Sequence, residues 1–492
     1  MVRHNEPALF LFYYLCIKPD TMKRFCLFMA LLLSAACTRV SEPAPCGPVP
    51  SERQLNWHQL ERYVFIHFTT NTFTDLEWGY GDESEQIFNP TACDPRQWAD
   101  IVSRAGFKGI VLTAKHHDGF CLWDTKYTEH NIMNSPYGRD LVREVSDACR
   151  EYGLKFGVYL SPWDRNHPDY GTPAYIDYYR NQLTELLTNY GDIFEVWFDG
   201  ANGGDGWYGG ADERRTIDNL TYYDWPVTWE IVREKQPQAT MFSDGGPDCR
   251  WVGNEAGFAG ETNWCTLNKA EFAPGHADTY ALNHGQEDGT DWLPAEVDVS
   301  IRPGWFYHER EDSRVKSVEQ LMDIYYKSIG RNGNLILNVP PDRRGLIHPI
   351  DSANLIAFGK AIEKEFAHNY AEEARFEASN VRGKARRFAA SQVTGKGYWA
   401  TDDGVTEASL TAGFRKPVTL SKIVLQEHIA LGQRVQRFSV EALVDGQWQT
   451  LDEQTTIGNK RIIRFDPVTT SAVRVNILAS KACIALDNVG LY

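Results

Sequence analysis

The chain has 492 residues, 42% of them hydrophobic and 24% charged, which is a globular composition and excludes a disordered chain. The formal net charge of −16 argues against DNA or RNA as a partner, because proteins that bind nucleic acids need a basic surface. Aromatic residues make up 13% of the chain, which fits either a large core or a site that stacks on the apolar face of a sugar.

The first 36 residues are predicted to be a signal region. A basic start at Met22, the expected first residue, is followed by an apolar run and then by small residues. The ending LSAAC resembles a bacterial lipoprotein signal, which predicts cleavage before Cys37 and a lipid on its thiol. An ordinary signal peptide with an incidental cysteine is the alternative. We expect an exported protein, periplasmic or on the cell surface, held at a membrane only through this lipid.

Residues 37–55 are rich in Pro, Ser and Glu and are predicted to be a linker. From residue 56 to residue 370, short apolar segments typical of buried parallel strands alternate with helical patterns. The predicted strands are Tyr63–Phe68, Gly109–His116, Lys155–Pro162, Ile193–Asp199, Thr240–Asp244, Glu296–Ile301 and Asn334–Val339. The predicted helices are Pro95–Ala105, Leu141–Tyr152, Ala174–Tyr190, Thr228–Lys235 and Val318–Ile329.

This alternation predicts an α/β fold made of repeated βαβ units. A TIM-like (β/α)8 barrel of irregular form fits best, with an eighth strand expected around Gly257–Thr262. A doubly wound open sheet is the alternative, but no GxGxxG follows any strand, and we expect no organic cofactor. Residues 371–492 change to short alternating segments separated by turn residues, which predicts an antiparallel β-sandwich.

Barrel enzymes carry their working residues at the carboxyl ends of the strands. The side chains expected there are His67, Glu77, Trp78, His116, His117, Tyr159, Asp199, Glu255 and Trp305. Asp199 closes the apolar strand FEVWFD, where a carboxylate is costly unless it is hydrogen-bonded or functional. Two carboxylates among histidine and tryptophan side chains suit glycoside hydrolysis. The adjacent pair His116 and His117 fits a metal site poorly, because successive strand residues point to opposite faces, and no metal is expected.

At these residues the chain resembles the α-L-fucosidases of glycoside hydrolase family 29. The resemblance runs over about residues 56–370 and rests on five segments in order. They are IHF with His67, EWG with Glu77 and Trp78, KHHDGF from Lys115, VWFDGA from Val196 and GNLILNVPPDRRGLI from Gly333. It implies a retaining exo-acting enzyme with a barrel and a carboxy-terminal β-sandwich, acting on fucosylated glycans.

The resemblance also implies roles for single residues. Asp199 matches the nucleophile, and Glu255, within DCRWVGNEAG, matches the general acid/base of the branch that cleaves α-1,3 and α-1,4 linkages in Lewis-type glycans. Glu261 is the alternative acid/base. The positions that match fucose-holding residues are His67, Glu77, Trp78, His116, His117, Tyr159 and Trp305.

The carboxy-terminal segment resembles discoidin-like carbohydrate-binding modules, through YWATDDG, QRVQRFSVEAL and the closing ALDNVGLY. Sugar binding by this module and a purely structural role as a brace for the barrel both remain open. Two other functions stay as alternatives for the whole chain. One is a barrel hydrolase for another sugar, such as an α-galactosidase, and the other is a catalytically inactive surface protein that binds glycans.

Overall fold

The computed structural model describes residues 40–276 and 278–492. The predicted signal region and Cys37 lie outside these residues. Residues 43–492 form one compact unit. Within the described part of the chain, no helix combines the length and the apolar character that crossing a membrane requires.

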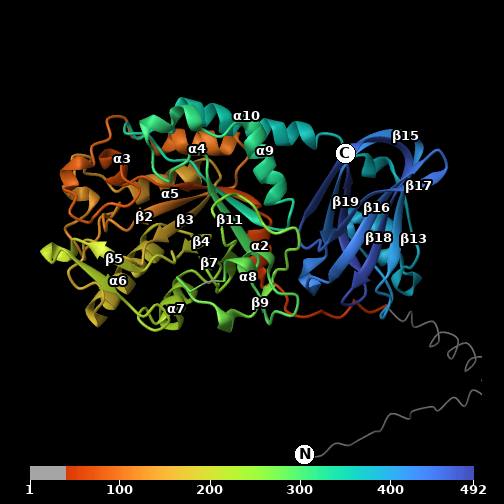
Figure 1. Ribbon diagram of the computed structural model, residues 1–492, viewed down its shortest axis with the longest axis horizontal. Helices are drawn as coiled ribbons and strands as arrows, with labels where there is room; N and C mark the ends of the chain where they lie inside the picture. The colour runs from red at the N-terminus through yellow and green to blue at the C-terminus, as the bar shows by residue number, and fades with distance from the viewer. Residues whose placement is uncertain (1–39, 277) are drawn as a thin grey trace, which may run out of the picture. The chain divides into compact units, whose positions relative to one another are not determined.

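Eight parallel strands close into a barrel in the order β1-β12-β11-β8-β7-β4-β3-β2. Figure 1 labels β2, β3, β4, β7 and β11 among them. The strands are β1 (Arg62–Ile66), β2 (Gly109–Lys115), β3 (Lys155–Leu160), β4 (Glu195–Trp197), β7 (Thr240–Ser243), β8 (Cys249–Trp251), β11 (Ala295–Ser300) and β12 (Asn334–Asn338). The predicted (β/α)8-type barrel is therefore confirmed, and the doubly wound sheet is not the fold.

Helices lie between most of these strands and cover the barrel. They are α4 (Pro95–Arg104), α5 (Leu141–Glu151), α6 (Pro173–Asn189), α7 (Trp225–Lys235), α8 (Thr279–His284) and α9 (Val318–Lys327), with α10 (Pro349–Glu365) after the last strand. Several begin at a residue that satisfies free backbone N–H groups. Asp140 accepts a 2.8 Å hydrogen bond from the N–H of Arg143, and Ser317 forms a capping box with Gln320.

The predicted position of the eighth strand is wrong. The strand is β8, Cys249–Trp251, and Gly257–Thr262 is a loop. Only residues 244–248 separate β7 from β8, so no helix precedes this strand. A strand of three residues is also too short to show a hydrophobic pattern in the sequence. Its pairing is nevertheless regular, with Cys249 beside Phe242 of β7 and Arg250 beside Ala295 of β11.

The barrel interior is filled with aromatic and apolar side chains, which accounts for part of the high aromatic content. A buried cluster there consists of Trp57, Tyr63, Phe65, Val111, Tyr159, Trp197, Phe242, Cys249 and Ile336. Trp57 comes from α2 (Glu52–His58), whose first residues overlap the end of the predicted linker. The remaining short elements are α3 (Asn71–Thr74), the pair β5 (Gly203–Gly206) and β6 (Glu213–Thr216), and the pair β9 (Thr266–Leu267) and β10 (Asp291–Trp292).

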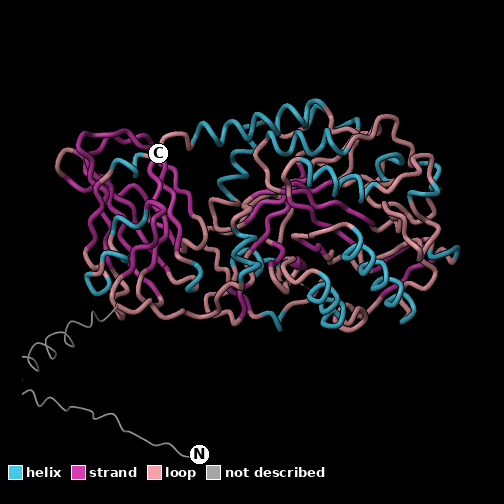
Figure 2. Tube along the Cα trace, turned by 180° about the vertical axis from the view of Figure 1, so that it is seen from behind, coloured by secondary structure: helices cyan, strands magenta, loops and turns pink. Residues whose placement is uncertain are grey.

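The carboxy-terminal domain is antiparallel, as predicted, and Figure 2 shows strands dominating it and long helices only around the barrel. Its strands are β13 (Arg375–Ala378), β14 (Thr394–Ala400), β15 (Ala408–Glu427), β16 (Val435–Val444), β17 (Gln447–Thr455), β18 (Arg461–Ser480) and β19 (Ala485–Leu491). β15 and β18 are 20 residues long each, because register shifts interrupt their pairing without ending either strand.

Backbone hydrogen bonds join this domain to the barrel. The N–H of Asn332 donates to the carbonyl of Lys460 at 2.9 Å, and the N–H of Ile462 donates to the carbonyl of Gly330 at 3.0 Å. The side chain of Gln433 adds a 3.1 Å bond to the carbonyl of Asn263. The sandwich thus braces the loop that precedes β12.

Candidate active site

A cavity of about 180 Å³ opens at the carboxyl ends of the barrel strands. Its lining contains eight of the nine predicted site residues, from segments as far apart in the sequence as β1 and the loop after β11. The lining residues are Phe65, His67, Trp78, His116, His117, Tyr159, Trp197, Asp199, Ala201, Glu255, Asp298 and Trp305. The barrel topology therefore brings together most of what the sequence indicated, at the end where barrel enzymes work.

Asp199 lies two residues after the end of β4, and its carboxylate is held by two donors. The hydroxyl of Tyr159 donates to Oδ2 at 2.9 Å, and the backbone N–H of Ala201 donates to Oδ1 at 2.7 Å. The Asp199 side chain is 24% exposed, and Nε2 of His117 lies 4.0 Å from Oδ2. The carboxylate is thus fixed in orientation but remains accessible from the cavity, as attack on a bound substrate requires.

His67 and His117 each present a ring nitrogen to the cavity as a hydrogen-bond acceptor. Asn338 directs its amide N–H groups at Ser300 and Trp305, so its oxygen accepts from Nδ1 of His67 at 2.9 Å. Ser161 donates to the carbonyl of Trp163, so it accepts from Nδ1 of His117 at 2.7 Å. In both rings Nε2 is then the unprotonated nitrogen.

Burial keeps all three histidines of the cavity uncharged. It lowers the pKa of His67 to about 3 and that of His117 to about 4, although the charge of Asp199 opposes the second shift. Burial also lowers the pKa of His116 well below its usual value. A wall of neutral imidazoles suits the hydroxyl groups of an uncharged polyol better than an anion.

Glu255 lies at the rim of the cavity. The indole N–H of Trp305 donates to its Oε2 at 3.2 Å. Partial enclosure of the carboxyl group raises the pKa of Glu255, and the charges of Asp199 and Glu77 raise it further, whereas the bond from Trp305 lowers it. A carboxyl group with a raised pKa in the same cavity as an accessible carboxylate is the arrangement that acid-assisted bond cleavage needs.

Glu77 is the predicted site residue that does not line the cavity. Its Oε2 accepts the backbone N–H of Trp305 at 2.7 Å, and its Oε1 lies 2.5 Å from Nε2 of His308. Glu77 thereby holds the loop that carries Trp305. The neighbouring Trp78 is 53% exposed, with its ring edge-on to His117 at a centroid distance of 5.3 Å.

Glu261, the alternative acid/base, lies outside the cavity. Its carboxylate is 75% exposed and pairs with Arg331 at 3.0 Å. Glu255 is therefore the glutamate of the two that shares the cavity with Asp199.

Sequence reasoning missed Asp298 of β11. This residue is only 3% exposed, lines the cavity and accepts a 2.9 Å hydrogen bond from the indole of Trp251. Burial raises its pKa well above the usual carboxyl range, and the charge of Glu255 adds to the shift. The sequence AEVDVS contained an indication of this residue, because Glu296 and Asp298 are two positions apart and therefore point to the same, inward face of the strand.

Comparison with known proteins decides the family. The family model described as alpha-L-fucosidase matches residues 48–365, and the model described as F5/8 type C domain matches residues 373–486. The chain is also 43% identical over 459 residues to "Putative alpha-L-fucosidase 1" of Oryza sativa subsp. japonica, covering 92% of this chain and 86% of the rice protein. The chain belongs to the α-L-fucosidase family.

Solved structures agree with this family assignment. A glycoside hydrolase 29 family member from an unknown rumen bacterium is 49% identical, with a TM-score of 0.82 over 91% of this chain and 78% of that one. A GH29 fucosidase of Ruminococcus gnavus, solved in complex with fucose, is 30% identical, with a TM-score of 0.82 over 92% and 96% of the two chains. The protein is therefore a glycoside hydrolase of the α-L-fucosidase type, and nothing supports the α-galactosidase alternative.

Proposed function

We propose that this α-L-fucosidase is an exo-acting enzyme that releases terminal fucose with retention of configuration. Asp199 is the nucleophile and Glu255 is the general acid/base. The observation that carries this assignment is the position of the two groups in one cavity. The carboxylate of Asp199 is oriented by Tyr159 and Ala201, and Glu255 at the rim has a raised pKa.

In the first step Asp199 attacks the anomeric carbon as Glu255 gives its proton to the oxygen of the leaving sugar. The glycosidic C–O bond breaks, and an ester bond forms between Asp199 and fucose. Glu255, now ionised, then removes a proton from a water molecule that attacks the same carbon and breaks the ester. Two inversions return the original configuration, and Glu255 regains its proton.

The remaining cavity residues hold the sugar. Nε2 of His67 and Nε2 of His117 accept hydrogen bonds from fucose hydroxyls. The half-buried ring of Trp305 and the exposed ring of Trp78 face the apolar side of the sugar. His116 adds a third neutral ring, and Glu77 acts through the loop of Trp305. A fucose complex of the Ruminococcus gnavus relative supports fucose as the sugar in this cavity.

The expected glycans are branched ones that carry α-1,3- or α-1,4-linked fucose. This preference rests on the resemblance of residues 248–257 to the corresponding branch of the family. Glu255 lies on that segment and lines the cavity. Lewis-type trisaccharides tested against an α-1,2-linked fucoside decide the point, and faster cleavage of the α-1,2 linkage contradicts it.

Azide rescue tests the two catalytic assignments separately. In Asp199→Ala, azide occupies the space of the nucleophile and should give the β-fucosyl azide. In Glu255→Ala, an activated aryl fucoside should still form the ester, and azide should then give the α-fucosyl azide. The opposite pairing of product and variant would reverse the two assignments.

A further inference from the structure

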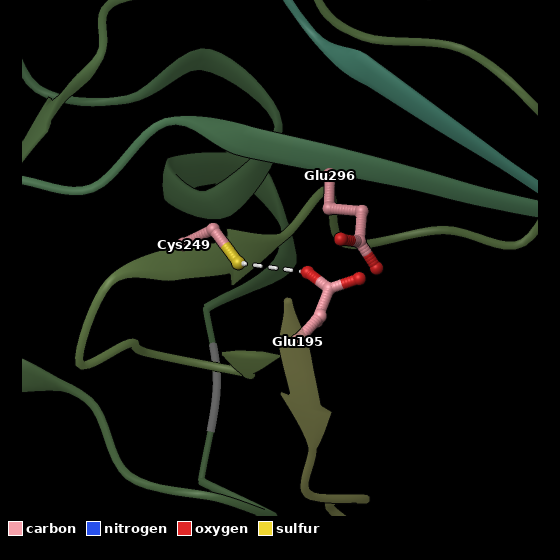
Figure 3. Close-up of side chains that lie close together, drawn as sticks. All are labelled: Glu195, Cys249 and Glu296. Atoms are coloured by element: carbon pink, nitrogen blue, oxygen red, sulfur yellow. Dashed lines mark hydrogen bonds between the residues drawn. The ribbon is translucent and has the colours of Figure 1, made fainter. Parts of the chain in front are cut away.

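A second pair of carboxyl groups lies inside the barrel, toward the amino ends of the strands. Glu195 on β4 and Glu296 on β11 are both 0% exposed, and we call them the buried acid pair. One carboxylate oxygen of Glu195, one of Glu296 and the Sγ atom of Cys249 all lie within 4.8 Å of one another (Figure 3). No ion pair among the described residues includes either glutamate, so two full negative charges here would be very costly.

The hydrogen bonds around the buried acid pair are unequal. Both oxygens of Glu296 accept donors, Oε1 from the indole of Trp197 at 2.8 Å and Oε2 from the hydroxyl of Tyr63. Oε1 of Glu195 faces three donors, the indole of Trp57 at 3.1 Å, the hydroxyl of Tyr63 at 3.3 Å and the thiol of Cys249 at 3.8 Å. Its Oε2 is buried and has no hydrogen-bond partner. Figure 3 shows the two carboxyl groups facing each other, with the sulfur of Cys249 on the other side of Glu195.

We propose that Glu195 is a neutral acid that donates a hydrogen bond from Oε2 to the carboxylate of Glu296. The buried acid pair then shares one proton and positions Trp197 beneath the catalytic cavity. This arrangement gives the orphaned oxygen a role and leaves a single negative charge, which already accepts bonds from Tyr63 and Trp197.

The surroundings of the pair favour the same distribution of charge. Burial raises the pKa of Glu195 well above its usual value, and the charge of Glu296 raises it further. Burial raises the pKa of Glu296 too, but the bonds that it accepts oppose the shift, so it is the better carboxylate. The facing Tyr63 and Cys249 also have pKa values raised by burial and stay neutral.

Two arginine side chains near the buried acid pair are bound to a different carboxylate. Asp248, beside Cys249, is paired with Arg53 at 3.0 Å and with Arg233. Those cations are therefore engaged by another carboxylate and not by the buried acid pair.

The pair is connected to the cavity through Trp197. This ring lines the cavity and stacks on Phe242 at a centroid distance of 3.9 Å and an angle of 10°. It also lies 5.4 Å from the ring of Tyr159, which donates to Asp199. Glu195 and Glu296 are thus positioning residues, which act on the reaction only through Trp197 and its neighbours.

A divalent cation held by Glu195, Glu296 and Cys249 is the competing occupant of the same space. Such an ion would need ligand oxygens and a thiolate, whereas Glu296 already accepts two donors and the Cys249 thiol is held neutral. The two models predict opposite effects of substitution at Glu195.

Glu195→Gln and Glu296→Gln form a matched pair of test variants. The amide of Glu195→Gln supplies the same donor to Glu296 and the same acceptor to Trp57, so we expect normal folding and a kcat/KM within about twofold of the wild type. The amide of Glu296→Gln must turn its NH2 group toward Trp197 or Tyr63, which are themselves donors to Glu296. We therefore expect a lower Tm and a kcat/KM reduced by up to about tenfold.

The pH dependence of Tm and the infrared spectrum identify the proton itself. Because the raised pKa of Glu195 belongs to the folded state, the stability it contributes is complete below the usual carboxyl pKa and is lost as pH rises toward the raised value. The Tm of Glu195→Gln should therefore exceed that of the wild type by a margin that increases as the pH rises above the usual carboxyl pKa. The variant should also lack one protonated carboxyl band at neutral pH.

Several results would overturn the proposal. They are an unfolded or inactive Glu195→Gln, an unchanged carboxyl band, or one equivalent of metal that is present in the wild type and lost in Glu195→Gln. The Tm, infrared and metal measurements do not depend on the glycoside that is cleaved, so they stand even if the proposed linkage or mechanism fails.

Discussion

The hydroxyl of Tyr159 donates a 2.9 Å hydrogen bond to Oδ2 of Asp199, from a ring that is only 1% exposed. The bond runs from β3 to the loop that follows β4, and these two strands are neighbours in the barrel. It fixes the direction of the carboxylate that we assign as the nucleophile. Loss of this donor should therefore affect the reaction more than the fold.

Tyr159→Phe should lower kcat/KM by about 10- to 100-fold, the range expected for a lost hydrogen bond to a charged group. The matched control is Tyr179→Phe, which removes a buried hydroxyl that donates to the carbonyl of Leu160 at 3.0 Å and does not line the cavity. That variant should lose stability but keep its kcat/KM. Equal activity losses in the two variants would show that the hydrogen bond to Asp199 has no specific part in the reaction.

The pH profile of kcat/KM should fall on its basic side as Glu255 loses its proton. The pKa of Glu255 is raised by enclosure and by the charge of Asp199, so this basic limb should lie above the usual range of a carboxyl group. In Glu255→Ala, assayed with an aryl fucoside whose leaving group needs no acid, the limb should disappear. A basic limb that persists unchanged in Glu255→Ala would assign it to another residue.

Asp298 should behave as a neutral group. Because burial keeps its pKa well above the usual range, Asp298→Asn should retain most of kcat/KM and leave the basic limb of the pH profile in place. If Asp298 were ionised, removing its charge would lower the pKa of Glu255 and move that limb to lower pH. Asp298→Ala, which leaves the indole of Trp251 without its acceptor, should be the more damaging substitution.

The amino-terminal hypothesis is tested by fractionation of cells. Cys37→Ser should move the enzyme from the membrane fraction to the soluble fraction without changing its kcat/KM, because the catalytic cavity lies within residues 65–305. Cys46→Ser is the matched control and should stay with the membrane. Membrane association of Cys37→Ser at the wild-type level would contradict the lipid anchor.

The barrel could be predicted because most of its strands are apolar segments that end in polar residues. The segment FEVWFD predicts from the sequence alone that Asp199 lies at the end of a strand. The positions of His67, His116 and Tyr159 were predicted in the same way, from the ends of other apolar segments. β8 could not be predicted, since a strand of three residues after a five-residue turn has neither a pattern nor a preceding helix. Contacts between residues on different strands of the barrel also could not be predicted from the sequence.

Two features of the interior show why tertiary pairing escapes the sequence. Glu195 and Glu296 are 101 residues apart, and only closure of the barrel brings β4 and β11 to opposite sides of one buried space. The hydrogen bond from the backbone N–H of Trp305 to Glu77 likewise depends on the loop that follows β11. The family motif therefore predicted that Glu77 lies near the active site, but not that it binds this loop.

The most direct test of the central claim is to trap the fucosyl-enzyme. A 2-deoxy-2-fluoro-L-fucosyl fluoride should form the ester and hydrolyse it slowly, so that mass spectrometry of the digested protein can locate the label. We predict one label for each chain, on the peptide that contains Asp199. A label on the peptide of Glu255 or of another carboxylate would contradict the account.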